Sequence, residues 1–152
     1  MPDDIKKQVA FFPDKFGACY WIGTGIYAGL FILTPVLTQE ADLQSFILLF
    51  YGSMVVPLFE EIIFRGLLWN GLQKVIGRAW VVYLVTSALF ALWHLGYVDS
   101  LVLHTEENLS NVLFWKAIVG LFYGLVLGVL RLKTKNCYST FLLHGILNIF
   151  GR

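Results

Sequence analysis

Five long apolar segments limit the fold of this chain more than any other feature. They cover approximately residues 16–38, 43–68, 79–98, 112–130 and 138–150. A membrane-spanning helix needs about 20 mostly apolar residues, and the first four segments meet that length. Only 14% of the 152 residues are charged, whereas soluble domains carry about 25%. We therefore predict an all-α fold, in which residues 1–152 form a single polytopic membrane domain, a transmembrane bundle of about five helices.

The second and fifth segments differ from a simple span. The second can continue to about residue 73 as one long helix, with a kink near Pro57 because proline lacks the N–H that the helix needs. The fifth has about 13 residues, which is short for a span. Either it ends within the membrane or the natural protein continues beyond Arg152, and the sequence leaves both possibilities open.

The basic residues alternate between successive loops. They precede the first segment and lie between the second and third and between the fourth and fifth, whereas the other two loops contain acidic residues and no lysine or arginine. By the positive-inside rule, the N-terminus is cytoplasmic and the C-terminus lies outside. The basic residues are Lys6, Lys7, Lys15, Lys74, Arg78, Arg131, Lys133 and Lys135.

Composition excludes some partners and favours one compartment. The net charge is +1 and no basic patch is present, so nucleic acid is not expected as a partner. Cys19 and Cys137 lack metal-binding or redox spacing. The N-terminal residues lack a cleavage site and are interpreted as a short cytoplasmic lead. The small size and few loops favour a prokaryotic inner (cell) membrane.

Three sets of polar residues interrupt the apolar segments. Ionisable residues at membrane depth cost roughly 2.5 kcal/mol or more each, and they mark a functional site by default. Residues four apart share one face of a helix. The three sets are Glu60, Glu61 and Arg65 in the second segment, His94 in the third, and His144 and Asn148 in the fifth.

The three sets are expected at one depth in the membrane. Glu60 precedes a turn near Ile76 by 16 residues and His94 follows that turn by 18, so at about 1.5 Å per residue their depths differ by a few ångströms. His144 lies 11 residues after a turn near Lys133, which corresponds to roughly 16 Å. We therefore predict that the three sets meet in one layer.

These groups suit hydrolysis of an amide bond within the membrane. Glu60 beside a neutral His94 can take a proton from a water molecule between them. His144 and the amide of Asn148 offer two donors to a developing oxyanion. Alternatively, Glu60, His94 and His144 could supply three ligands to Zn²⁺. The sequence lacks the His-Glu-x-x-His signature, so the spacing does not demand a metal.

Structural roles are the competing interpretation of the same residues. Glu61 and Arg65 could form an ion pair that stabilises the bundle, and His144 with Asn148 could join helices by hydrogen bonds. His94 could be an interfacial polar residue.

Small and aromatic residues suggest packing and anchoring. Gly120, Gly124 and Gly128 recur at four-residue spacing and predict a closely packed face on the fourth helix. Tryptophans are enriched at membrane interfaces. On that basis five are interpreted mostly as anchors: Trp21, Trp69, Trp80, Trp93 and Trp115.

At the polar sets the chain resembles the CPBP family of intramembrane proteases, also called the Abi or type II CAAX prenyl endopeptidase family. Its motifs are Glu-Glu-x-x-x-Arg, which resembles residues 60–65, Phe-x-x-x-His, which resembles residues 90–94, and His-x-x-x-Asn, which resembles residues 144–148. The resemblance covers roughly residues 43–150, the motif-bearing core, and keeps the order of the motifs.

The resemblance implies a helical membrane fold and endopeptidase activity. By motif position, Glu60 and His94 would activate the water, and His144 and Asn148 would form the oxyanion site. The remaining motif residues, Glu61, Arg65 and Phe90, would assist. Both a metal-dependent and a metal-free, glutamate-based mechanism are argued for the family, and the sequence leaves both open.

Family members differ in substrate and in size. Some cleave prenylated CAAX proteins, and others process bacterial peptides, trim C-terminal sorting tails or confer bacteriocin self-immunity. Many have about eight spans where this chain has five at most, so the additional helices are either dispensable or replaced by formation of a homodimer.

Two other functions use the same residues. A non-catalytic bacteriocin-immunity or peptide-binding membrane protein could hold a peptide in the buried site. A small proton-coupled transporter could use Glu60, His94 and His144 as a proton path. The lack of paired broken helices argues against the transporter.

Overall fold

A computed structural model of the chain describes residues 11–39, 42–96 and 109–151. These residues form helices and no strand, which confirms the predicted all-α fold. Lys6 and Lys7 lie outside the described residues. The helices are α2 (Ala18–Leu37), a long composite helix (Leu43–Ile76), α6 (Ala79–Leu95), α8 (Leu109–Thr134) and α9 (Cys137–Phe150).

Length and exposure define an integral membrane protein. Three helices are long and apolar enough to cross a membrane: Ala18–Leu37, Leu43–Ile76 and Ser110–Thr134. The helices α6 and α9 are apolar but shorter, with 17 and 14 residues. Large apolar side chains cover much of the outside, whereas charged and polar side chains are buried inside. In water this distribution would be unfavourable, because apolar burial drives folding. In a bilayer, lipid contacts the apolar side chains.

The composite helix consists of α3 (Leu43–Phe50), the π-helical turn η1 (Tyr51–Val55), α4 (Val56–Glu61), the π-helical turn η2 (Ile62–Leu68) and α5 (Trp69–Ile76). Its 34 residues correspond to roughly 50 Å, which exceeds the ~30 Å hydrocarbon core. It ends at Ile76, three residues beyond the predicted limit, and Gly77, whose φ of 73° suits a residue without a side chain, caps it. Turns of the π type often occur at functional sites.

The first π-helical turn ends two residues before Pro57, the position where the sequence predicts a kink. Because Pro57 has no N–H, it cannot bond the carbonyl of Ser53, four residues earlier. The hydroxyl of Tyr27 on α2 donates to that carbonyl at 2.7 Å. The side-chain amide of Asn148 on α9 donates to the neighbouring carbonyl of Gly52 at 2.8 Å. Two other helices therefore satisfy the main chain at this turn.

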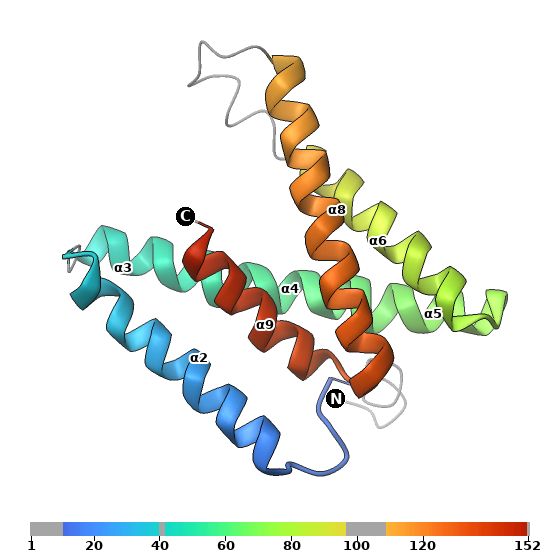
Figure 1. The fold of residues 1–152 in the computed structure, drawn as a ribbon, viewed down its shortest axis with the longest axis horizontal. Coiled ribbons are helices and arrows are strands. Elements are labelled where there is room, and N and C mark those ends of the chain that lie inside the picture. Colours follow the sequence, from blue (N-terminus) through green and yellow to red (C-terminus); the bar gives the residue numbers. More distant parts are fainter. Residues whose placement is uncertain (1–10, 40–41, 97–108, 152) are drawn as a thin grey trace.

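The helices pack in two groups along the composite helix (Figure 1). The hairpin of α6 and α8 crosses its α5 end, whereas α2 and α9 pack along its α3–α4 part. Figure 1 places the turns α5–α6 and α8–α9 toward the lower right and the C-terminal end of α9 toward the upper left. Successive helices therefore alternate in direction, as expected for a polytopic bundle.

Glycines let the helices approach closely. A Cβ atom at Gly124 would lie 2.9 Å from the carbonyl oxygen of Ser87, and one at Gly120 would lie 3.2 Å from Cβ of His94. On α9, a Cβ atom at Gly145 would lie 2.6 Å from the carbonyl oxygen of Ser53. The predicted packing face on α8 is thus confirmed. A glycine on α9, Gly145, likewise lets α9 pack closely against the composite helix.

Candidate active site

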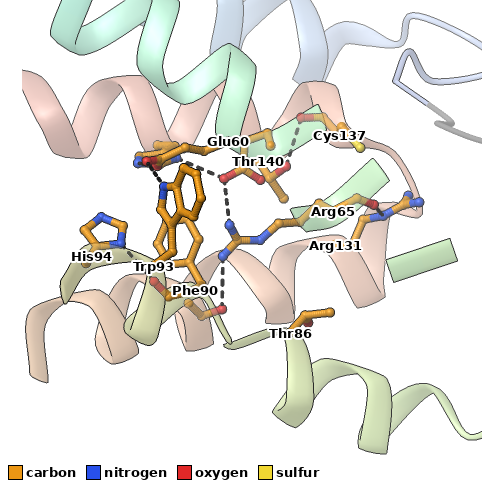
Figure 2. A network of polar contacts seen from close by, with 12 residues as sticks. Glu60, Arg65, Thr86, Phe90, Trp93, His94, Arg131, Cys137 and Thr140 are labelled. Atoms are coloured by element: carbon orange, nitrogen blue, oxygen red, sulfur yellow. Dashed lines mark hydrogen bonds and ion pairs between the residues drawn. The ribbon is translucent and has the colours of Figure 1, made fainter. Parts of the chain in front are cut away.

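A buried group of charged side chains lies where the composite helix meets α6, α8 and α9 (Figure 2). Glu60, Glu61, Arg65 and His144 are each at most 1% exposed. Glu61 is the centre of the group. Its Oε1 atom accepts a hydrogen bond from Arg65 Nη1 at 3.0 Å and lies 2.9 Å from His144 Nδ1. One carboxylate oxygen therefore joins the composite helix to α9.

Arg65 is fixed by three helices. Besides pairing with Glu61, its Nη2 atom donates to the carbonyl oxygen of Gly124 on α8 at 3.4 Å. Its Cζ atom lies 4.1 Å from the centre of the Phe90 ring on α6, a cation–π contact that strengthens when water is excluded. Phe90 is fully buried. The guanidinium thus compensates one of two buried carboxylates and has little freedom to move.

Glu60 is held differently from Glu61. Its Oε1 atom accepts a hydrogen bond from the indole Nε1 of Trp93 at 3.1 Å. Its Oε2 atom lies 3.6 Å from His144 Nε2, and within the described ranges this buried oxygen has no hydrogen-bond partner. A buried carboxylate oxygen without a donor is costly. Glu60 therefore offers an acceptor that a water molecule or a substrate N–H would satisfy.

The contacts of the two histidines set their proton positions. His94 Nδ1 lies 2.9 Å from the carbonyl oxygen of Phe90. A carbonyl oxygen only accepts, so Nδ1 carries the hydrogen and Nε2 of the neutral ring keeps its lone pair. His144 Nδ1 likewise carries a hydrogen toward Glu61, and protonation of Nε2 gives an imidazolium between two carboxylates. With Arg65, an imidazolium at His144 would balance both negative charges.

The structure brings most of the predicted residues together. The rings of Phe90 and His144 lie 5.7 Å apart, and those of Phe90 and His94 lie 4.5 Å apart, so Phe90 is the spacer between the two histidines. Figure 2 shows His94 beside Trp93 at the edge of the network. Asn148 lies one turn beyond His144 on α9, where its amide donates to Gly52. Its oxyanion role stays a prediction.

Sequence reasoning missed the role of Arg131. We expected a cytoplasmic loop residue after a span ending at residue 130, but α8 continues to Thr134 and Arg131 is only 4% exposed. Its Nε atom donates to the carbonyl oxygen of Arg65 at 2.9 Å, and its Nη2 atom donates to Asn70 Oδ1 at 3.2 Å. No local pattern distinguishes it from Lys133, so only the length of α8 could have signalled its burial.

Sequence reasoning also missed the contact of Trp93. We interpreted it as an interface anchor, yet its indole N–H binds Glu60. The signal was available in part, because Trp93 directly precedes the motif residue His94.

The predicted metal ligands do not form a cluster. Among the residues that the structure describes, no group of three His, Cys, Asp or Glu side chains is placed to hold a metal ion. Glu60, His94 and His144 therefore do not fit a three-ligand zinc site in this arrangement. Whether the protein uses a metal stays a prediction, and the mechanism proposed below includes no step through one.

The fold defines the chain as a helical integral membrane protein, and its buried glutamates and histidine are of the kinds that enzymes use for hydrolysis. The family described as type II CAAX prenyl endopeptidase Rce1-like matches residues 42–150. The chain belongs to this family, which supports a CAAX-type intramembrane endopeptidase. No curated protein and no solved structure matches the chain.

Proposed function

We propose that the protein hydrolyses a peptide bond of a membrane-associated substrate, using a water molecule activated by Glu60 and His94. The observation that carries the proposal is the Oε2 atom of Glu60, a buried carboxylate oxygen that has no hydrogen-bond partner among the described residues and lies 3.6 Å from His144 Nε2. Glu61 Oε2 also has no partner there, but the Glu61 carboxylate is already bound by Arg65 and His144. A general base must lie within hydrogen-bond reach of the proton that it removes. Glu60 Oε2 can therefore accept a hydrogen bond from the attacking water molecule.

The reaction needs four groups. Water bound to Glu60 Oε2 gives a proton to the carboxylate as its oxygen attacks the scissile carbonyl carbon, and the lone pair on His94 Nε2 orients that water. His144 Nε2–H, with Asn148, stabilises the oxyanion of the tetrahedral intermediate. When the C–N bond breaks, Glu60 returns the proton to the leaving amine. The products are a carboxylic acid and an amine, and Glu60 is again ionised.

Glu61 and Arg65 prepare the site without taking part in proton transfer. The Arg65 guanidinium and the Nδ1–H of His144 both bind Glu61, so Glu61 fixes the imidazole ring and sets which nitrogen faces Glu60. An acidic residue that orients a catalytic histidine in this way is a recurring device in hydrolases. Phe90 spaces the two histidines and supports Arg65.

We propose a peptide or protein substrate that reaches the site from the bilayer, either prenylated near its C-terminus (CAAX type) or carrying a C-terminal sorting tail. The site is buried among helices whose outer faces are apolar, which suits a substrate that is itself anchored in lipid. The family description favours the prenylated class.

Substitution Glu60→Gln tests the proposal, because it removes the base and preserves the shape of the side chain. Purified protein is incubated with prenylated CAAX peptides and with membrane-tail peptides, and products are identified by mass spectrometry. We expect wild-type cleavage and at least about a 100-fold lower rate for the variant. A chelator arm, with zinc added back, separates a metal-bound water from a glutamate-activated one.

Asp42→Asn is the matched control, because it makes the same carboxylate-to-amide change at an exposed position. Asp42 caps α3 by accepting the Ser45 N–H at 3.0 Å, a bond that lowers the pKa of Asp42, and asparagine caps a helix equally well. Equal rates for wild type and Glu60→Gln would exclude Glu60 as the base. Full biological function without cleavage would favour peptide binding, and pH-driven flux in liposomes would favour transport.

A further inference from the structure

Trp93 connects α6 to the proposed base and has no role in the scheme above. Its indole Nε1 lies 3.1 Å from Glu60 Oε1, and its ring packs edge-on against Phe64 at 5.9 Å between centroids. Figure 2 shows the indole upright beside Glu60, with its nitrogen at the carboxylate end. The side chain is 39% exposed, so it stands at the border between the buried network and the outside.

A carboxylate has two equivalent oxygens, and its terminal torsion is broad. Without a fixed donor, Glu60 would present either oxygen to a bound water. An indole N–H is a donor only, so it can hold an oxygen without exchanging a proton with the reaction. Occupation of Oε1 by Trp93 leaves Oε2, the atom that lies 3.6 Å from His144 Nε2, facing the histidine.

We propose that Trp93 is a positioning residue that selects Glu60 Oε2 as the oxygen that receives the proton of the attacking water. This inference rests on the proposed function, because it assigns Glu60 as the base. The ring contact with Phe64 fixes the indole, the indole fixes the carboxylate, and the carboxylate fixes the water. Trp93 touches neither water nor substrate in this scheme.

The kinetic test is Trp93→Phe, which keeps an aromatic ring and removes the N–H. We expect kcat to fall about tenfold or more, whereas KM changes less than about twofold, because the lost contact matters for the chemical step and not for substrate binding. Trp80→Phe on the same helix is the control, since Trp80 is 60% exposed. A second variant carries 3-benzothienylalanine at position 93, which preserves the bicyclic shape and lacks the donor.

The second variant separates positioning from packing. If both position-93 variants lose kcat at an unchanged unfolding temperature, the N–H is the cause. If the benzothienyl variant keeps the wild-type kcat, the N–H does not position Glu60 and the proposal is overturned. The same holds if Trp93→Phe itself keeps the wild-type kcat.

A spectroscopic test does not depend on activity. In protein labelled with ¹⁵N at the five indoles, the Trp93 signal is assigned by its absence in Trp93→Phe. We expect Glu60→Gln to move the Trp93 indole proton upfield by more than any other, because a charged acceptor makes the shorter hydrogen bond. An unchanged signal would mean that the indole does not bind Glu60. If the wild-type protein cleaves no substrate, the proposed function fails. The Trp93 indole signal would still show whether the indole N–H binds Glu60.

Discussion

Two adjacent glutamates in one helix share His144 as a neighbour but differ in their other partners, and we infer from this difference which one supports the structure and which one takes part in the chemistry. Glu61 Oε1 contacts both Arg65 and His144, whereas Glu60 Oε1 accepts the indole N–H of Trp93 and its Oε2 lies 3.6 Å from His144 Nε2. The Oε2 atoms of both glutamates have no hydrogen-bond partner among the described residues. Adjacent positions point about 100° apart around a helix, so Glu61 faces α9 and the paired arginine, while Glu60 lies between Trp93 on α6 and His144 on α9.

At this scale we predict that Glu61→Gln and Glu60→Gln have different effects on stability. Loss of the Glu61 charge leaves Arg65 buried without its partner and releases the His144 ring, so the variant should lose about 3 kcal/mol or more of stability. Thermal unfolding in detergent measures the difference.

Glu60→Gln serves as the control, because it replaces a carboxylate that has no guanidinium partner. We expect it to unfold within a few degrees of wild type. Equal destabilisation of the two variants would contradict the division of roles.

At the scale of secondary structure, the two π-helical turns flank the glutamates and are each held by side chains of other helices. In the second turn, the N–H of Trp69 bonds the carbonyls of Phe64 and Gly66 and misses that of Arg65. Arg131 Nε donates to the Arg65 carbonyl. The first turn uses Tyr27 and Asn148 in the same way. The turns therefore persist because tertiary donors replace the missing main-chain bonds.

We predict that Arg131→Gln destabilises the protein by roughly 1–3 kcal/mol, because it leaves a buried carbonyl without its charged donor. Lys133→Gln makes the same charge change two residues further along α8, at an exposed position, and should change stability by less than about 0.5 kcal/mol. Denaturation in detergent measures both. Similar values for the two variants would mean that Arg131 does not hold the turn.

For the whole molecule, the direction of the bundle in the membrane stays a prediction of the positive-inside rule. Cys19 lies exposed near the start of α2, and Cys137 is fully buried, so the chain carries one accessible native thiol among the described residues. We predict that a membrane-impermeant maleimide labels Cys19 in inverted vesicles and leaves it unlabelled in intact cells.

Cys19→Ser is the control for that labelling, since it removes the exposed thiol and leaves Cys137 in place. Labelling of Cys19 in intact cells would reverse the assigned direction. Whether the protein forms a homodimer is a separate prediction, which the mass of the detergent-solubilised protein would test.

The apolar segments predicted the helices and their order well, because the length and hydropathy needed to cross a bilayer are local properties. Boundaries were less accurate where a polar residue was taken as a loop signal. Arg131 illustrates this limit: its charge suggested a cytoplasmic loop, whereas α8 continues past it and buries it.

By itself, the sequence determined that the chain is a helical membrane protein and that Glu60, Glu61, Arg65, His94 and His144 are the residues to examine, because charged groups in apolar segments are costly unless they have a purpose. Tertiary structure alone decided which oxygen of each glutamate is bonded, and that Trp93 and Arg131 belong to the network. Such contacts join residues far apart in the chain. These contacts depend on how each helix is rotated about its axis and on how closely glycines let neighbouring helices approach. Hydropathy and residue spacing do not encode either property.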